Sequence, residues 1–68
     1  QGWAMDDQEH DIGQRCIGAP IYDYRGEMIA SLSVSGTIEQ ITDEKILPIA
    51  KHISKIGIEI SKRLGYTE

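Results

Sequence analysis

The sequence has little cysteine, few positive charges and no long hydrophobic run. Its one cysteine, Cys16, excludes an internal disulfide and gives no pair of cysteines at the spacing of a zinc site. A reducing, cytoplasmic location is therefore the expectation. No apolar segment approaches the roughly 20 residues of a membrane span, and no basic and apolar leader opens the chain. We expect no membrane segment, no metal site and no cofactor.

The length sets a second limit. A chain of 68 residues forms at most one small domain and is only marginally able to bury a self-sufficient core. It begins at Gln1 without an initiator methionine, so we expect a piece of a longer protein.

Negative charge is unevenly placed. The chain has 11 Asp and Glu against 7 Lys and Arg, a net charge of −4. Four acids, at Asp6, Asp7, Glu9 and Asp11, lie in one short segment without Lys or Arg. Such a surface repels phosphate backbones, so direct contact with nucleic acid is not expected from this chain.

Two apolar runs, 14–22 and 27–35, flank a turn signal and predict an antiparallel hairpin in which Gly26 has a positive φ. A loop with an even number of residues sets three apolar pairs on one face: Ile17 with Leu32, Ala19 with Ala30, and Ile21 with Met28. The other face then collects small and polar residues: Cys16 with Ser33, Gly18 with Ser31, Pro20 with Ile29, and Ser35 beyond. A loop of three residues would mix the two faces, so the pattern favours the even loop.

The C-terminal third has the spacing of an amphipathic helix at about 43–64, with Thr42 as its N-cap and Gly65 as its left-handed stop. We expect this helix to cover the apolar hairpin face. Residues 1–5 are interpreted as the end of a strand and 6–13 as a loop. Apolar residues of the helix recur at steps of three and four: Ile46, Ile49, Ala50, Ile53, Ile56, Gly57, Ile60 and Leu64.

Several motifs follow one another along nearly the whole chain. An acidic loop at 6–11 precedes a strand around Cys16, a D-x-x-G turn at 23–26, an S-x-S strand at 33–35 and a closing helix that ends in ISKRLGY. No single motif is specific, but the ordered set resembles the C-terminal part of the effector-binding domain of IclR-family bacterial transcription regulators.

The resemblance implies an α+β, GAF-like fold, with a curved antiparallel sheet, helices on one side and a small-molecule pocket on the other. It implies that residues 1–68 are the C-terminal part of a single ligand-binding domain. A winged helix-turn-helix DNA-binding domain would precede this chain and make the only contact with DNA. Family members sense small metabolites, often organic acids, and work as dimers or tetramers. The family's polar pocket positions map onto Asp6, Cys16, Ser33 and Ser35, and the rest of the pocket belongs to a segment before Gln1.

Two other functions stay open from the residues. The chain could be a structural dimerisation module without a ligand, or an enzyme fragment. Nucleophilic chemistry at Cys16 would need a base close by, and the nearest candidate, His10, lies in the expected loop. A lone cysteine is most often a small hydrophobic residue, so we predict no catalytic residues. We also expect that the chain does not stand alone, because one strand edge has no partner within it.

Overall fold

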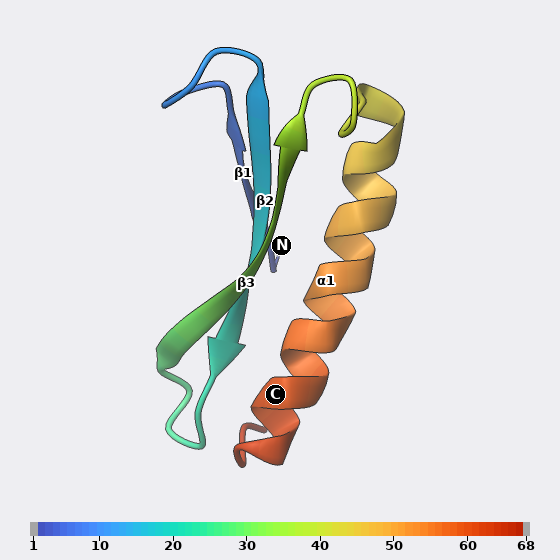
Figure 1. Ribbon diagram of the computed structural model, residues 1–68. Coiled ribbons are helices and arrows are strands. Elements are labelled where there is room, and N and C mark those ends of the chain that lie inside the picture. Colours follow the sequence, from blue (N-terminus) through green and yellow to red (C-terminus); the bar gives the residue numbers. More distant parts are fainter. Residues whose placement is uncertain (1, 68) are drawn as a thin grey trace.

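The computed structural model describes residues 2–67 and contains one antiparallel sheet and one long helix. The strands β1 (Ala4–Asp7), β2 (Gln14–Tyr22) and β3 (Met28–Thr37) lie side by side in the order β1-β2-β3. Helix α1 (Asp43–Arg63) runs along one face of this sheet (Figure 1). The predicted α+β class, hairpin strands and helix are confirmed. The strand end predicted over 1–5 is β1, displaced toward the C-terminus, and residue 1 lies outside the described part.

The hairpin loop holds three residues rather than an even number. The backbone N–H of Asp23 donates to the carbonyl of Glu27 at 3.0 Å, and the N–H of Gly26 donates to the carbonyl of Asp23 at 3.0 Å. Gly26 has a φ of 80°, the left-handed conformation that a three-residue loop of this kind requires. The positive φ at Gly26 is confirmed, and the even loop is wrong.

A β-bulge beside the loop restores the two faces of the sheet. Ile21 pairs with Ala30 whereas Tyr22 pairs with Met28, so Ile29 is an extra residue on β3. The odd loop shifts the pairing by one residue, and the inserted residue shifts it by one more. Because side chains alternate with a period of two, each side chain from Ala30 to Ser35 still lies on its predicted face. The predicted pairs themselves are wrong, and the observed ones are Cys16 with Ser35, Ile17 with Val34, Gly18 with Ser33, Ala19 with Leu32, and Pro20 with Ser31.

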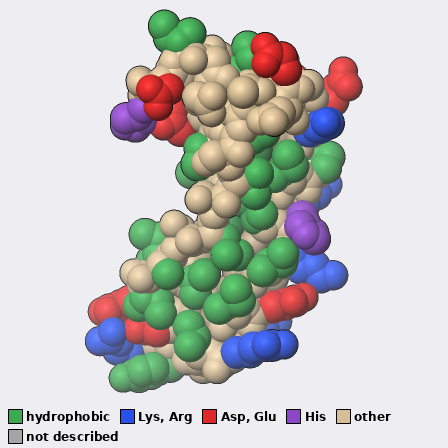
Figure 2. All heavy atoms as spheres, in the orientation of Figure 1, with side chains coloured by type: hydrophobic (Ala, Val, Ile, Leu, Met, Phe, Trp, Pro, Cys, Tyr) green, Lys and Arg blue, Asp and Glu red, His purple; other side chains and the backbone are tan. Residues whose placement is uncertain are grey.

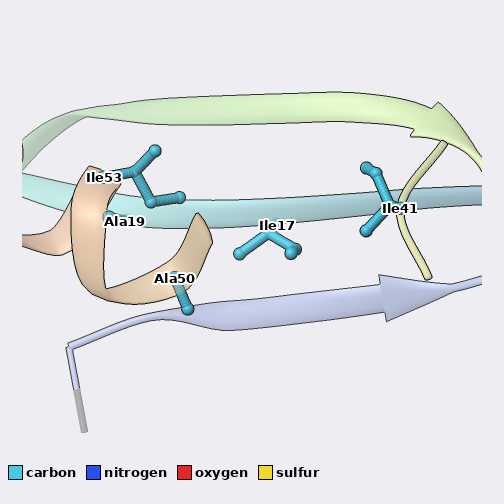
Figure 3. Packing of buried hydrophobic residues seen from close by; sticks show 5 residues of the cluster. All are labelled: Ile17, Ala19, Ile41, Ala50 and Ile53. Atoms are coloured by element: carbon cyan, nitrogen blue, oxygen red, sulfur yellow. The ribbon is translucent and has the colours of Figure 1, made fainter. Parts of the chain in front are cut away.

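The core lies between β2 and α1. β2 supplies Ile17 and Ala19, as its alternation predicts, and both are fully or almost fully buried. Figure 3 shows these two side chains facing residues of α1, with the connector after β3 closing one end of the cluster. The buried hydrophobic cluster consists of Ile17, Ala19, Ile41, Ala50 and Ile53.

The predicted burial under α1 is correct for β2 and partly wrong for β3. Ile21 is buried and Leu32 is half-buried, but Ala30 is exposed. The helix packs mainly on β2, so this end of β3 extends beyond it. Met28 is 65% exposed, because the bulge sets it opposite Tyr22, on the face that α1 does not cover.

One close contact fixes α1 against the end of β2. A Cβ atom on Gly57 would lie 2.8 Å from the carbonyl oxygen of Pro20, so only glycine fits there without a shift. The hydroxyl of Ser61, which is fully buried, donates to the carbonyl of Gly57 at 2.7 Å and accepts the N–H of Tyr22 at 2.8 Å. Close packing therefore explains a glycine in the middle of this helix.

The helix ends close to the predicted residues. Thr42 has the extended backbone of an N-cap, but its side chain makes no capping hydrogen bond. At the other end Gly65 has a φ of 93°, and the N–H of Tyr66 donates to the carbonyl of Ser61 at 3.0 Å. This is the Schellman arrangement that glycine permits. The ring of Tyr66 then stacks on that of Tyr22 with centroids 5.0 Å apart.

Candidate functional site

The four predicted site residues lie on the sheet face opposite α1, and they come from all three strands. Asp6 of β1 lies opposite Cys16 of β2, and Cys16 lies opposite Ser35 of β3. Ser33 lies opposite Gly18, in the next cross-strand pair on this face. It shares a face with Ser35 because side chains two residues apart on a strand point the same way. We call Asp6, Cys16, Ser33 and Ser35 the polar patch.

Two details of the patch differ from the sequence prediction. Cys16 is opposite Ser35 and diagonal to Ser33, because the register moves by two residues. Asp6 and Asp7 belong to β1 rather than to a loop, because they pair with Cys16 and Arg15 across the sheet. The prediction that Cys16, Ser33 and Ser35 share one face is confirmed.

The patch contains mostly neutral hydrogen-bonding groups. The hydroxyl of Ser35 donates to the sulfur of Cys16 at 3.4 Å, and both serines are exposed while Cys16 is half-buried. A hydroxyl rotates freely and can donate to an incoming oxygen or accept from it. The two serines can therefore hold a small polar molecule without burying a protein charge.

Asp6 is the one carboxylate of the patch, and its two oxygens have different partners. One oxygen lies 2.6 Å from Nδ1 of His10, and the other accepts the backbone N–H of Glu9 at 2.9 Å. The hydrogen bond to His10, followed by that from Glu9, lowers the pKa of Asp6 below its usual 3.8. In return, the hydrogen bond and the charge of Asp6 raise the pKa of His10 above its usual 6.5.

Arg15 lies behind the patch and was not recognised from the sequence. Its guanidinium group lies 2.9 Å from a carboxylate oxygen of Asp7, 2.9 Å from one of Asp43, and donates to the carbonyl of Ile41 at 2.9 Å. Only 12% of this side chain is exposed. Asp7 pairs with Arg15 because Asp6 pairs with Cys16 one step away in the antiparallel ladder. The sequence pattern predicted a loop at 6–13, so it gave no signal for this contact. Arg15 therefore ties β1 and β2 to the beginning of α1.

A largely apolar hollow of about 420 Å³ lies on the same side of the sheet, toward the hairpin end. Its lining includes Gly18, Pro20, Tyr22, Met28 and Ser31, and Gly18 adjoins Ser33 across the strands. No polar-patch residue lines it. Figure 2 shows hydrophobic side chains gathered toward the hairpin end, where acidic and basic side chains also lie, and a histidine beside acidic side chains at the end of the β1–β2 loop.

Within residues 2–67, no group of three His, Cys, Asp or Glu side chains is placed to hold a metal ion. In the same part of the chain, α1 is not apolar enough over its length to cross a bilayer.

Comparison with known proteins gives one consistent result. Residues 1–62 match the family model described as bacterial transcriptional regulator IclR, C-terminal. The chain is 36% identical to the Acetate operon repressor of Salmonella typhimurium and 35% identical to the Transcriptional repressor IclR of Escherichia coli. These alignments cover 98% and 96% of this chain but only 24% of each relative, so the chain spans about a quarter of their length.

Solved structures agree with the sequence comparison. The Thermotoga maritima IclR has 40% sequence identity and a TM-score of 0.88, over 96% of this chain and 26% of that one. The Agobacterium tumefaciens repressor BlcR has 33% identity and a TM-score of 0.89, over 98% of this chain and 27% of that one. The sheet and helix described above therefore form a part of the larger fold that these proteins share.

Proposed function

Because this chain belongs to the IclR family of bacterial transcriptional regulators, as part of the C-terminal effector-binding domain, we propose that its open sheet face binds a small organic acid. The observation that carries the proposal is the row of Asp6, Cys16 and Ser35 across three strands, with Ser33 beside it. Four polar side chains converge there on the face that α1 leaves uncovered.

The chemistry of the patch fits a small carboxylic acid, and a further keto or hydroxyl oxygen on that acid would find partners there too. The hydroxyls of Ser33 and Ser35 donate to a carboxylate or keto oxygen, and the thiol of Cys16 is a weak donor beside them. Asp6 accepts a hydrogen bond from a ligand hydroxyl. One relative is named for an acetate operon, and acetate is a small carboxylic acid. A second part of the pocket, contributed by residues outside this chain, would complete the enclosure.

We propose binding rather than catalysis. Cys16 has the hydroxyl of Ser35 as its neighbour, while His10 is engaged with Asp6, so no described contact joins this thiol to a base. In the longer protein, ligand binding would change the affinity of a winged helix-turn-helix domain for DNA. We propose that this protein works in the cytoplasm, as a dimer or tetramer.

The test is ligand-dependent stabilisation of the full-length regulator. Acetate, pyruvate and benzoate are added separately, and the melting temperature is measured by thermal shift. A ligand present at 100 times its dissociation constant stabilises the folded state by about 2.7 kcal/mol, which raises the melting temperature by several degrees. The Ser33→Ala and Ser35→Ala variants should lose most of this rise.

Ser54→Ala is the matched control. Ser54 lies on α1, on the other side of the sheet from the polar patch, and its removal should preserve the rise. The proposal is overturned if none of the three acids raises the melting temperature. It is also overturned if the two patch variants respond as the unchanged protein does.

A further inference from the structure

His10 lies at the border of the polar patch and has a member of the patch as its partner. Its Nδ1 is 2.6 Å from a carboxylate oxygen of Asp6, and its side chain is 86% exposed, against 35% for Asp6. Asp6 is the only carboxylate among the four patch residues. The net charge that the patch presents to a ligand therefore depends on whether His10 is protonated.

Building on the function proposed above, we propose that His10 is a specificity-determining residue of this site. In its protonated form it neutralises the Asp6 carboxylate and thereby admits an anionic ligand. When His10 loses its proton, the charge of Asp6 is no longer balanced and repels a carboxylate bound to Ser33 and Ser35. The affinity for a neutral ligand of the same shape would not change when His10 loses its proton.

The surrounding charges support this assignment. Glu9 precedes His10 and also raises its pKa, in addition to the larger effect of Asp6. Asp7 follows Asp6, but Arg15 lies 2.9 Å from its carboxylate. On the neighbouring strands, β2 presents the thiol of Cys16 opposite Asp6, and β3 presents only the hydroxyl of Ser35 in that row. No positive side chain other than His10 is described in contact with Asp6.

The direction of the pH dependence follows. The contact with Asp6 raises the pKa of His10 above 6.5, so His10 is protonated at pH 6 and loses its charge at higher pH. A carboxylate ligand is itself ionised throughout this range, since carboxyl groups titrate near pH 4. Affinity for an anionic ligand should be highest near pH 6 and should fall as the pH rises through the pKa of His10.

The experiment uses the full-length regulator with benzoate and pyruvate as anionic probes and benzamide as a neutral analogue. Dissociation constants are measured by isothermal titration calorimetry from pH 6 to pH 9. We expect the affinity for the two acids to fall by about threefold to tenfold over this range, the size of one screened charge at short distance. The affinity for benzamide should stay constant.

Three variants separate charge from structure. His10→Gln should bind the acids weakly at every pH, and His10→Lys, which stays charged, should bind them tightly at every pH. His52→Gln removes the chain's other histidine, which is exposed on α1, and should keep the pH dependence of the unchanged protein. Independently of any ligand, the ring of His10 can be titrated by NMR, where Asp6→Asn should bring its pKa back toward 6.5.

The possible failures are distinguishable. If the acids bind but their affinity does not change with pH, or if His10→Gln keeps the pH dependence, the role of His10 is overturned and the proposed ligand class stands. The role is likewise overturned if the NMR titration of His10 is unaffected by Asp6→Asn. If neither acid binds at any pH, the proposed function falls and the role of His10 falls with it.

Discussion

Ser61 shows how much of the structure can depend on one buried hydroxyl. It accepts the N–H of Tyr22 and donates to the carbonyl of Gly57. Ser61→Ala would leave that N–H buried without a partner, so we expect the free energy of unfolding to fall by about 1–3 kcal/mol. Urea denaturation of the C-terminal domain measures this loss.

A matched serine provides the comparison. Ser33 is exposed on the open face, and Ser33→Ala should change the free energy of unfolding by less than about 0.5 kcal/mol. A loss of less than about 0.5 kcal/mol for Ser61→Ala as well would mean that the Ser61 bridge between α1 and β2 adds no stability.

At the scale of the elements, the contact between α1 and β2 has no room for a side chain at position 57. In an exposed helix, Gly→Ala gains up to about 1 kcal/mol from helix propensity. Here the added methyl group would meet the carbonyl of Pro20 at 2.8 Å, and the net effect of Gly57→Ala should be a loss of about 1–3 kcal/mol. Denaturation midpoints test the sign, with Lys51→Ala on the exposed helix surface as the control. A stabilised Gly57→Ala would show that the two elements can move apart freely.

The hairpin turn should make stability depend on pH. The carboxylate of Asp23 accepts hydrogen bonds from the guanidinium of Arg25 at 2.8 and 3.1 Å and from the backbone N–H groups of Arg25 and Glu27. The contact with Arg25, followed by the two backbone hydrogen bonds, lowers the pKa of Asp23 below 3.8. Because the folded-state pKa is the lower one, the stabilisation is complete above about pH 4 and is lost as the pH falls through that lowered pKa.

Asp23→Asn removes this contribution. The variant should melt at a lower temperature than the unchanged protein at pH 7, and the gap should close as the pH is lowered below 4. Circular dichroism melting curves across this range give the result. If the difference in melting temperature between the two proteins stays constant down to pH 2, the lost stability comes from hydrogen-bond geometry rather than from the charge of Asp23.

The hairpin also shows what the sequence could and could not predict. Alternation along β2 correctly assigned Ile17 and Ala19 to the core and Cys16 to the other face, because that pattern depends only on the period of a strand. The pairing failed because two local irregularities, the three-residue loop and the extra Ile29, shift the register in the same direction. Each is set by backbone geometry that a hydrophobic pattern does not contain.

In the candidate site, the residues themselves could be predicted from the sequence, but their hydrogen-bond partners could not. Asp6, Cys16, Ser33 and Ser35 were named through a family resemblance and the face of a strand, and the strands do bring them together. The partners of these residues were not predicted, because His10 reaches Asp6 through the conformation of the β1–β2 loop. In that loop Gln8 has a positive φ, which is uncommon for a residue with a side chain.

At the scale of the whole molecule, both outer strands of the described sheet, β1 and β3, have an edge without a partner strand among residues 2–67, and the β3 edge carries exposed apolar side chains. β3 is the last strand in the order β1-β2-β3, and Met28 and Ile29 on it are 65% and 52% exposed. Unpaired strand edges with apolar side chains recruit further strands, and a single helix covers only one sheet face. In the longer protein this edge would be available to another segment or to a second subunit.

The 68-residue segment by itself should therefore associate. Sedimentation at tens of micromolar should give an average mass well above the 7.6 kDa of one chain, since edge pairing hides both backbone groups and apolar side chains. Ile29→Lys, which sets a charge at this edge, should shift the segment toward the monomer. Ile12→Lys is the control, because Ile12 is 95% exposed in the β1–β2 loop and away from the β3 edge. A sharply melting monomer at the same concentration, unchanged by Ile29→Lys, would show that one helix and three strands are enough for an independent fold.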